Sequence, residues 1–409
     1  MYLPKPFIGG VVASFLLLQL LFLANMAYLY GSAYHDSIRI SSMDVLFVDY
    51  DQDVIGSSIN TAYQGLASKG FPTIHQHSTT DYPTPDDVRQ AVCKGQYWGA
   101  IYTNTNASSR LSSALASPQT AETYDNTEAL TYVWNGAKYS AYAQTIYSSL
   151  EMLVQATRGA YSQINGTAVM ATANITDTRI AQTLLDPISA SSIDIKPTNQ
   201  GVRFYYNTVS MVMPILQQFF FVMALNGISS ESDIIRLLSL KMGILLRLSL
   251  SICYTFIGSL CMTGYIWGFR EDWDVNGGQF ALTWMAIWLV MHLNFLLIDS
   301  VTVVLPTKFM PFAILTWIII NVSSSISPFD LSAGFYRVGY ALPAYELYQL
   351  LLDIWTDGCN PPLYRTLPIL FAWWLIGFVA FIFGMRKRYS QEVSGYMEKD
   401  LSKMSLPLA

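Results

Sequence analysis

FALTWMAIWLVMHLNFLLIDSVTVVL, residues 280–305, is the stretch of sequence that decides the fold. Asp299 is its only charged side chain. A helix needs about 20 consecutive apolar residues to cross the hydrocarbon core of a bilayer. This stretch therefore predicts a membrane-spanning helix.

Five further apolar segments lie along the chain, and a polar insert separates the first from the second. Charged residues make up 12% of the sequence, against about 25% in soluble globular proteins, and the mean hydropathy is +0.32. We therefore predict a polytopic α-helical membrane protein with six transmembrane helices, at residues 7–30, 204–226, 242–266, 280–305, 309–325 and 366–385.

Basic residues in the short loops predict the orientation, because cytoplasmic loops are enriched in Lys and Arg. They all fall on one side if both termini are cytoplasmic: Lys5, Arg236, Lys241, Arg247, Lys308 and Arg386–Arg388. Three N-glycosylation sequons, at Asn106, Asn165 and Asn174, lie in the insert, where a glycosylating lumen would modify them. The predicted domains are an anchor at 1–30, an extracytoplasmic domain at 31–203, a membrane domain at 204–385 and a cytoplasmic tail at 386–409.

The first apolar segment could instead be a cleaved signal peptide. Phe7 to Tyr30 is longer than the apolar core of about 7–15 residues in such a peptide. Gly31-Ser32-Ala33 is only a fair cleavage site. We therefore favour an uncleaved anchor.

The insert has the pattern of a small α/β domain, because short runs rich in β-branched and aromatic residues alternate with helical stretches. Asn165–Thr178, rich in Ser, Thr and Asn, is predicted to be a flexible loop. The expected strands are Met43–Tyr50, Thr73–Gln76, Tyr97–Tyr102 and Thr131–Trp134, and the expected helices are Val54–Lys69, Thr84–Cys93 and Tyr139–Tyr161.

Four cysteines add little to this prediction. Cys93 and Cys359 both fall on the predicted extracytoplasmic side, where a disulfide is chemically permitted. Without geometry, two unpaired small hydrophobic residues are the favoured interpretation.

Catalytic and cofactor motifs are absent from the sequence: it has no phosphate-binding loop, no H-E-x-x-H and no G-x-S-x-G. His75 and His77 share one face of a predicted strand, but they lack a nearby third ligand. We therefore expect no enzyme, cofactor or metal site. The net charge of −5 also disfavours nucleic acid as a partner.

Polar side chains inside the predicted spans are the candidate functional residues, because they are costly in a bilayer. His292, Asn294 and Asp299 lie in the fourth span, and Gln217 and Gln218 follow Pro214 in the second. They either line a translocation pathway or serve as interhelical hydrogen-bonding groups, worth about 0.6 kcal/mol each.

The segment 327–362 is predicted to contain a broken helix on the extracytoplasmic side. Ser327-Pro328-Phe329-Asp330 ends the fifth helix, and Pro343–Trp355 forms another. Glu346, Gln349 and Asp353 lie on one stripe of that helix. We therefore expect an interfacial or re-entrant helix with one side facing water.

Nearly the whole chain resembles a known family, with a similar layout of one span, a large outer domain and five spans. Residues 315–340, LTWIIINVSSSISPFDLSAGFYRVGY, with Ala341-Leu342-Pro343, look like the signature region of the fungal nitrosoguanidine-resistance membrane proteins. Val48-Asp49-Tyr50-Asp51 resembles the start of their outer domain. That family is similar in architecture to the permease domains of type-2 ABC exporters. The resemblance implies a role in export or resistance, and it supplies no catalytic residues.

Three classes of function follow. A permease-like protein would move a small amphipathic compound or a membrane lipid, with either a second copy of the chain or a separate energy-coupling protein as its partner. A regulator or scaffold would alter lipid asymmetry or another transporter without carrying anything. A membrane enzyme is disfavoured by the missing motifs. The expected location is the plasma membrane or an endomembrane.

Overall fold

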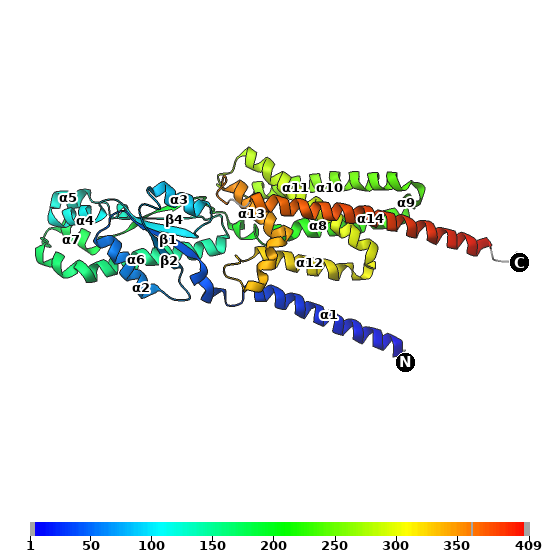
Figure 1. The fold of residues 1–409 in the computed structure, drawn as a ribbon, viewed down its shortest axis with the longest axis horizontal. Coiled ribbons are helices and arrows are strands. Elements are labelled where there is room, and N and C mark those ends of the chain that lie inside the picture. Colours follow the sequence, from blue (N-terminus) through cyan, green and yellow to red (C-terminus); the bar gives the residue numbers. More distant parts are fainter. Residues whose placement is uncertain (1–4, 361–362, 405–409) are drawn as a thin grey trace.

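Six long apolar helices and a mixed β-sheet make up the protein (Figure 1). The computed structural model describes residues 5–360 and 363–404. Three parts of the predicted domains lie outside the described residues: 1–4 of the anchor, 361–362 of the segment 327–362, and 405–409 of the tail. The six helices are α1 (Lys5–Ser32), α8 (Val209–Glu231), α10 (Leu240–Gly268), α11 (Gly277–Val304), α12 (Met310–Ser325) and α14 (Leu363–Met404).

Each of the six helices has the length and composition to cross a membrane, so the predicted polytopic helical membrane protein is confirmed. The second span begins five residues later than predicted, at Val209 instead of 204. Residues 201–205 form a short 3₁₀ helix instead. Tyr206 leaves the span to stack on Trp273, with ring centroids 5.4 Å apart.

Five strands between α1 and α8 form one sheet in the order β2-β1-β3-β4-β5. All neighbouring pairs are parallel except β3 and β4. We call residues 36–205 the sheet domain. Its strands are β1 (Asp44–Asp49), β2 (Thr73–His77), β3 (Gly99–Thr103), β4 (Leu130–Trp134) and β5 (Ala190–Asp194).

Helices cover both faces of the sheet, because alternate residues of a strand point to opposite sides. Val45 and Phe47 of β1 pack in one core with α2 and α6, whereas Leu46 and Val48 pack in another with α3. Thr84 caps α3 through a reciprocal pair of hydrogen bonds with Asp87. The helices of this domain are α2 (Val54–Leu66), α3 (Pro85–Cys93), α4 (Ala107–Ala116), α5 (Pro118–Thr123), α6 (Ser140–Thr172) and α7 (Thr178–Leu185).

The predicted loop at Asn165–Thr178 is wrong over its first half, because α6 continues to Thr172. The segment Ala168-Val169-Met170-Ala171 contains good helix formers that extend the apolar face of α6 beyond Tyr161. Strand β5 was not predicted, since Ala190-Ser191-Ser192 has few of the residues that favour strands.

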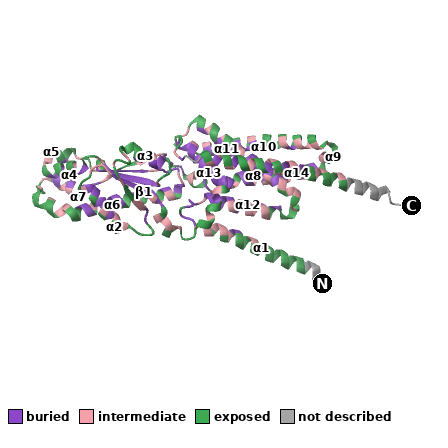
Figure 2. Cartoon of the chain, viewed as in Figure 1, coloured by how far each residue is buried: buried purple, intermediate pink, exposed green. Residues whose placement is uncertain are grey.

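In the membrane domain α11 is central and α1 is peripheral. Most of the apolar segment of α11 is buried within the protein, whereas that of α1 is almost entirely exposed (Figure 2). Helix α11 packs against α8, α10 and α14, whereas α1 packs along α12 and contacts Phe335 and Tyr336 through Tyr28. The short connecting elements are η1 (Asp36–Ser42), η2 (Asn126–Glu128), η3 (Gly201–Tyr205), α9 (Ile234–Leu237), η4 (Thr307–Phe309) and η5 (Gly334–Ala341).

Helix α13 (Pro343–Trp355) has the predicted bounds, but the predicted water-facing side is wrong. All of its residues except Ile354 are buried. Glu346, Gln349 and Asp353 are 0%, 5% and 8% exposed. The helix contacts α8, α11, α12 and α14, and its Tyr348 hydroxyl accepts a hydrogen bond of 2.8 Å from the backbone N–H of Tyr139 in the sheet domain. It is therefore a core element at the joint of the two domains.

Candidate functional site

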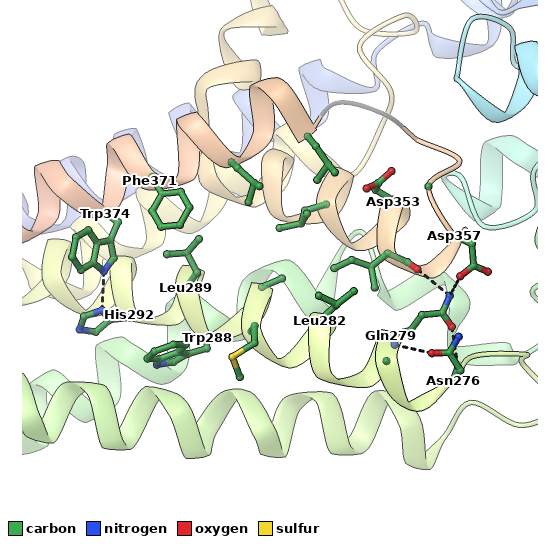
Figure 3. Close-up of a pocket in the computed structure, with 18 of the residues that line it drawn as sticks. Asn276, Gln279, Leu282, Trp288, Leu289, His292, Asp353, Asp357, Phe371 and Trp374 are labelled. Atoms are coloured by element: carbon green, nitrogen blue, oxygen red, sulfur yellow. Dashed lines mark hydrogen bonds between the residues drawn. The ribbon is translucent and has the colours of Figure 1, made fainter.

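A cavity of about 970 Å³ lies among α10, α11, α13 and α14 (Figure 3). It runs along α11 from Gln279, next to the sheet domain, to His292 in the middle of the helix. Thirteen residues of helix separate these positions, so the cavity is about 20 Å long. We call it the bundle cavity.

The end of the bundle cavity near the sheet domain is polar and acidic, because Asp353 and Asp357 both line it. Gln279 lies beside them and donates to Asp357 Oδ1 at 2.9 Å and to the carbonyl of Ile354 at 3.0 Å. Asn276 caps the start of α11 through a reciprocal pair of bonds with Gln279. Burial raises the pKa of Asp353 above its usual value.

The remainder of the cavity is apolar and ends at His292. Its walls come from α11 and α14 and include Leu282, Leu289 and Phe371 (Figure 3). At the inner end, Trp374 Nε1 donates to His292 Nδ1 at 2.9 Å, and Ser251 Oγ lies 3.2 Å from Nε2. Because Nδ1 accepts, a neutral His292 carries its proton on Nε2, which then donates to Ser251.

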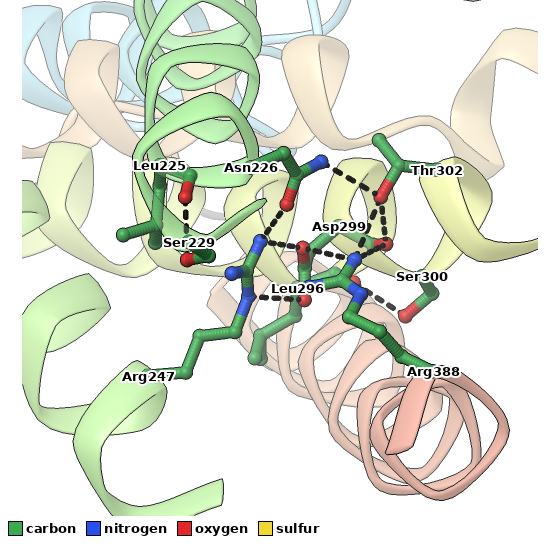
Figure 4. A network of polar contacts seen from close by, with 9 residues as sticks. All are labelled: Leu225, Asn226, Ser229, Arg247, Leu296, Asp299, Ser300, Thr302 and Arg388. Carbon is green, nitrogen blue, oxygen red and sulfur yellow. Dashed lines mark hydrogen bonds and ion pairs between the residues drawn. The ribbon is translucent and has the colours of Figure 1, made fainter. Parts of the chain in front are cut away.

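Asp299, the other charged candidate, lies between two arginines and does not line the bundle cavity (Figure 4). Its carboxylate accepts from Arg247 Nε at 3.0 Å and from Arg388 Nη2 at 3.0 Å. Arg247 also donates to Asn226, and Arg388 donates to Thr302 at 2.9 Å. We call Asn226, Arg247, Asp299, Thr302 and Arg388 the charge cluster.

The sequence pattern placed Arg247 and Arg388 at the ends of spans, facing the cytoplasm. In the structure they lie within α10 and α14 and are 5% and 12% exposed, respectively. The signal that could have found them is Asp299 itself, because a carboxylate within a span needs a cationic partner.

The three other predicted pathway residues lie apart from the bundle cavity. Asn294 bonds within the bundle, accepting from Trp317 Nε1 at 2.9 Å and donating to the carbonyl of Val290 at 2.8 Å. Gln217 packs where α8 meets Gly258 of α10. Gln218 is fully buried, and its amide has no hydrogen-bond partner among the described residues. The structure therefore brings His292 alone of the five to the bundle cavity.

Cys93 and Cys359 form a disulfide, so the favoured interpretation of two unpaired thiols is wrong. The bond joins the end of α3 in the sheet domain to the segment after α13. The folded chain brings these cysteines together across 266 residues of sequence, which no local pattern encodes.

Comparisons with known proteins identify a family without an assigned activity. Residues 14–379 match the family described as "Protein of unknown function (DUF3533)". A segment of 138 residues, 32% of this chain, is 27% identical to the uncharacterized endoplasmic reticulum membrane protein YJR015W of Saccharomyces cerevisiae. The match spans 26% of that protein's length. No solved structure matches significantly. These findings support a family of membrane proteins, and the likeness to nitrosoguanidine-resistance proteins and exporters remains a prediction.

Proposed function

The chain belongs to the DUF3533 family, and from its structure we propose that it binds an amphipathic molecule in the bundle cavity and moves it across the membrane. The observation that carries the proposal is the cavity, which combines an acidic end with a long apolar interior. Its volume of about 970 Å³ is near the upper end of the range for small-molecule sites, roughly 300–1,000 Å³.

The lining supports a ligand with an apolar chain and a polar head group. Leu282, Leu289 and Phe371 would pack against an apolar chain, which gains about 25 cal/mol per Å² of apolar surface relative to water but little relative to the bilayer interior. Asp353 and Asp357 favour a cationic or hydrogen-bond-donating head group. A small cationic amphiphile and a membrane lipid with an amine head group both fit this description.

We also propose that the sheet domain is extracytoplasmic and that both termini are cytoplasmic. The Cys93–Cys359 disulfide supports this orientation, because disulfides persist in oxidising compartments. The sequons at Asn106 and Asn174 lie on exposed parts of the same domain. A plasma membrane or endomembrane location and a role in resistance to toxic compounds accord with this orientation and with the resemblance of residues 315–343.

The chain contains no nucleotide-binding motif, so transport would follow a gradient or depend on a separate energy-coupling protein. The competing proposal is a regulator or scaffold that binds lipid and carries nothing. Both proposals allow a ligand to occupy the cavity. Only the transport proposal predicts that the ligand crosses the membrane, so a measurement of flux separates them.

A binding and flux experiment tests the proposal. Purified protein in liposomes would be titrated with a dansylated long-chain amine, and movement of the amine between leaflets would be followed by quenching from outside. Leu289→Trp should fill the cavity and reduce both binding and flux about tenfold or more. The matched control Leu260→Trp places the same bulk on an exposed part of α10 and should leave both unchanged.

The outcomes separate the proposals. Binding without flux in the wild type would support the regulator. Equal binding by wild type and Leu289→Trp would show that the bundle cavity is not the site. Comparison with a neutral amphiphile of the same chain length tests the acidic end, because the amine should bind more tightly only if Asp353 and Asp357 contact it.

A further inference from the structure

A second cavity, of about 310 Å³, lies at the joint between the sheet domain and the membrane domain. Tyr345 and Gln349 of α13 line it, whereas Leu350, Asp353 and Ile354 of the same helix line the bundle cavity. The two cavities therefore contact different faces of α13. We call this second one the joint cavity.

Positive charge dominates the lining of the joint cavity. Lys94 and Lys138 come from the sheet domain and Arg365 from the start of α14, against one carboxylate, Asp330. Asp330 accepts a hydrogen bond of 3.0 Å from Trp98 Nε1, which partly satisfies its charge. Three segments far apart in the sequence thus converge on a cationic cavity.

Aromatic rings hold two of these cations in place. Lys138 Nζ lies 4.2 Å from the centre of the Trp98 ring, and the Arg365 guanidinium carbon lies 5.0 Å from the Tyr340 ring and 5.4 Å from the Tyr345 ring. Cation–π contacts position a cation without using its N–H donors. Among the described residues, Lys138 Nζ makes no hydrogen bond or ion pair, so its donors remain available.

Arg365 is only partly neutralised by its protein partner. Its Nε lies 3.1 Å from Glu346 Oε1, but the two groups are not aligned as a hydrogen bond. The other oxygen of Glu346 accepts from Thr366 Oγ1 at 2.7 Å. Within the described part of the chain, the Tyr345 hydroxyl is the other polar partner of the Arg365 guanidinium, and these two partners leave most of its terminal N–H groups free. A guanidinium with free terminal N–H groups is suited to bidentate binding of an oxyanion.

We propose that the joint cavity binds a phosphate group through Lys138 and Arg365, with Lys94 at its rim. The phosphate belongs either to a lipid head group or to free inorganic phosphate, which share the same charge and acceptor oxygens. The position of the cavity is compatible with both sources. Tyr364, which lines it, is 83% exposed and lies at the start of the last span, where both water and lipid head groups are close. A bound phosphate would link the sheet domain to α14.

The test measures thermal unfolding of the full chain in nanodiscs, because a ligand that binds only the folded state raises Tm. In phosphatidylcholine nanodiscs, inorganic phosphate would be compared with chloride at equal ionic strength. In a second arm, without added phosphate, nanodiscs containing phosphatidic acid would be compared with phosphatidylcholine alone. A rise in the first arm identifies free phosphate, and a rise in the second arm alone identifies the lipid.

Variants decide whether the joint cavity is responsible. Lys138→Gln and Arg365→Gln should each lower the affinity for the phosphate about tenfold or more, and so reduce the rise in Tm, because each removes a charge-assisted contact. Lys69→Gln, which neutralises an exposed lysine elsewhere on the sheet domain, should not. If Arg365→Gln fails to fold, Lys138→Gln decides alone. No Tm rise in either arm, or a rise that survives Lys138→Gln unchanged, would overturn the proposal.

Discussion

Asp299 of α11 lies between two arginines that come from other helices. Its carboxylate is 2% exposed and contacts cations from two other helices, Arg247 of α10 and Arg388 of α14. A buried ion pair contributes little net stability, but removing one partner leaves an uncompensated charge. In this cluster, two arginines would be left without a carboxylate.

We therefore expect Asp299→Asn to destabilise the bundle by about 3–5 kcal/mol. Membrane abundance and the Tm of the detergent-solubilised protein should fall together, and any loss of transport should follow the loss of protein. Arg388→Gln is the matched comparison: it leaves a one-to-one pair of Arg247 and Asp299, so its effect should be smaller. Normal abundance of Asp299→Asn would contradict this account.

His292 should behave in the opposite way, because it lines the bundle cavity and makes only neutral hydrogen bonds to Ser251 and Trp374. His292→Phe keeps a ring of similar size and should lower binding of the dansylated amine several-fold at near-normal abundance. Parallel titrations and immunoblots measure both quantities. Wild-type binding would exclude His292 from the site, and matched falls in binding and abundance would assign it to packing.

The candidate residues could be predicted from the free-energy cost of placing a polar side chain in the bilayer, but their partners could not. A polar group within an apolar span is costly, so its presence alone singles it out. Whether it lines a cavity depends on what faces it from other helices. His292 and Asp299 lie seven residues apart on α11, yet one contacts the bundle cavity and the other contacts two arginines.

Lys138 provides a pH-dependent test of the joint cavity. Burial lowers its pKa to about 8, and the nearby Asp330 carboxylate opposes this shift. An anion favours the protonated amine, so affinity should be highest below pH 8 and fall as pH rises through that value. The other titratable or charged groups that face the cavity are Lys94, Arg365, Asp330, Tyr139, Tyr340, Tyr345 and Tyr364.

Sulfate is the suitable probe for this series, because its charge is constant between pH 6 and pH 9 while phosphate titrates. Sulfate affinity of the wild type should fall by up to tenfold per unit above pH 8. Lys138→Arg keeps its charge over the whole range and should show a flat profile. Parallel profiles for the two proteins would mean that another group controls binding.

Among the elements, α13 shows what a sequence pattern can and cannot specify. Pro343 at the first helical position marks its start, and the bounds were predicted correctly. Its polar stripe suggested contact with water. In the structure Glu346 contacts Arg365 and Thr366, and the Gln349 side chain donates to the Tyr139 hydroxyl and accepts from Asn360. The periodicity of a helix identifies a polar face, but only the fold supplies its partners.

Strand β5 illustrates the opposite limit. Ala190–Asp194 has weak strand propensity, and it forms a strand because β4 offers a free edge beside it. Strands β1 and β3 are almost fully buried and were predicted from their apolar runs. Central strands are therefore visible in the sequence, and an edge strand depends on pairing.

The η5 element offers a matched pair of glycines that tests packing against α12. A Cβ on Gly339 would lie 2.5 Å from Phe329 Cζ and 2.8 Å from Ser324 Cβ, whereas a Cβ on Gly334 meets nothing within 4 Å. Gly339→Ala should therefore lower stability by about 1–3 kcal/mol, and Gly334→Ala should have little effect. Thermal unfolding of both variants checks this, and equal Tm values would show that the segment relaxes without cost.

At the scale of the whole molecule, the disulfide and the joint fix the sheet domain on the bundle. Cys93–Cys359 adds a covalent link to polar contacts such as Trp98–Asp330 and Tyr139–Tyr348. The sequence permitted this link without specifying it, because pairing requires the two cysteines to meet in the folded chain. The same link bears on orientation, since a reducing cytosol would not maintain it.

The proposed orientation makes a prediction about glycosylation. Asn106 immediately precedes α4 and Asn174 lies between α6 and α7, both exposed, whereas Asn165 is half-buried on α6. A sequon must reach the lumenal enzyme on accessible chain, so Asn106 and Asn174 should carry most of the glycan. Asn321, a fourth sequon, is fully buried in α12 and should carry none.

Glycosidase treatment of the wild type should increase its gel mobility, and the triple variant Asn106→Gln, Asn165→Gln and Asn174→Gln should already migrate at the treated position. Asn165→Gln alone should cause little change. Asn60→Gln is the control, because Asn60 lies on the sheet domain outside any sequon. A cytoplasmic sheet domain could neither be glycosylated nor keep Cys93 and Cys359 oxidised. The contradicting result would be a wild type whose gel mobility does not change with glycosidase and whose Cys93 and Cys359 react with maleimide without prior reduction. It would reverse the proposed orientation of every span.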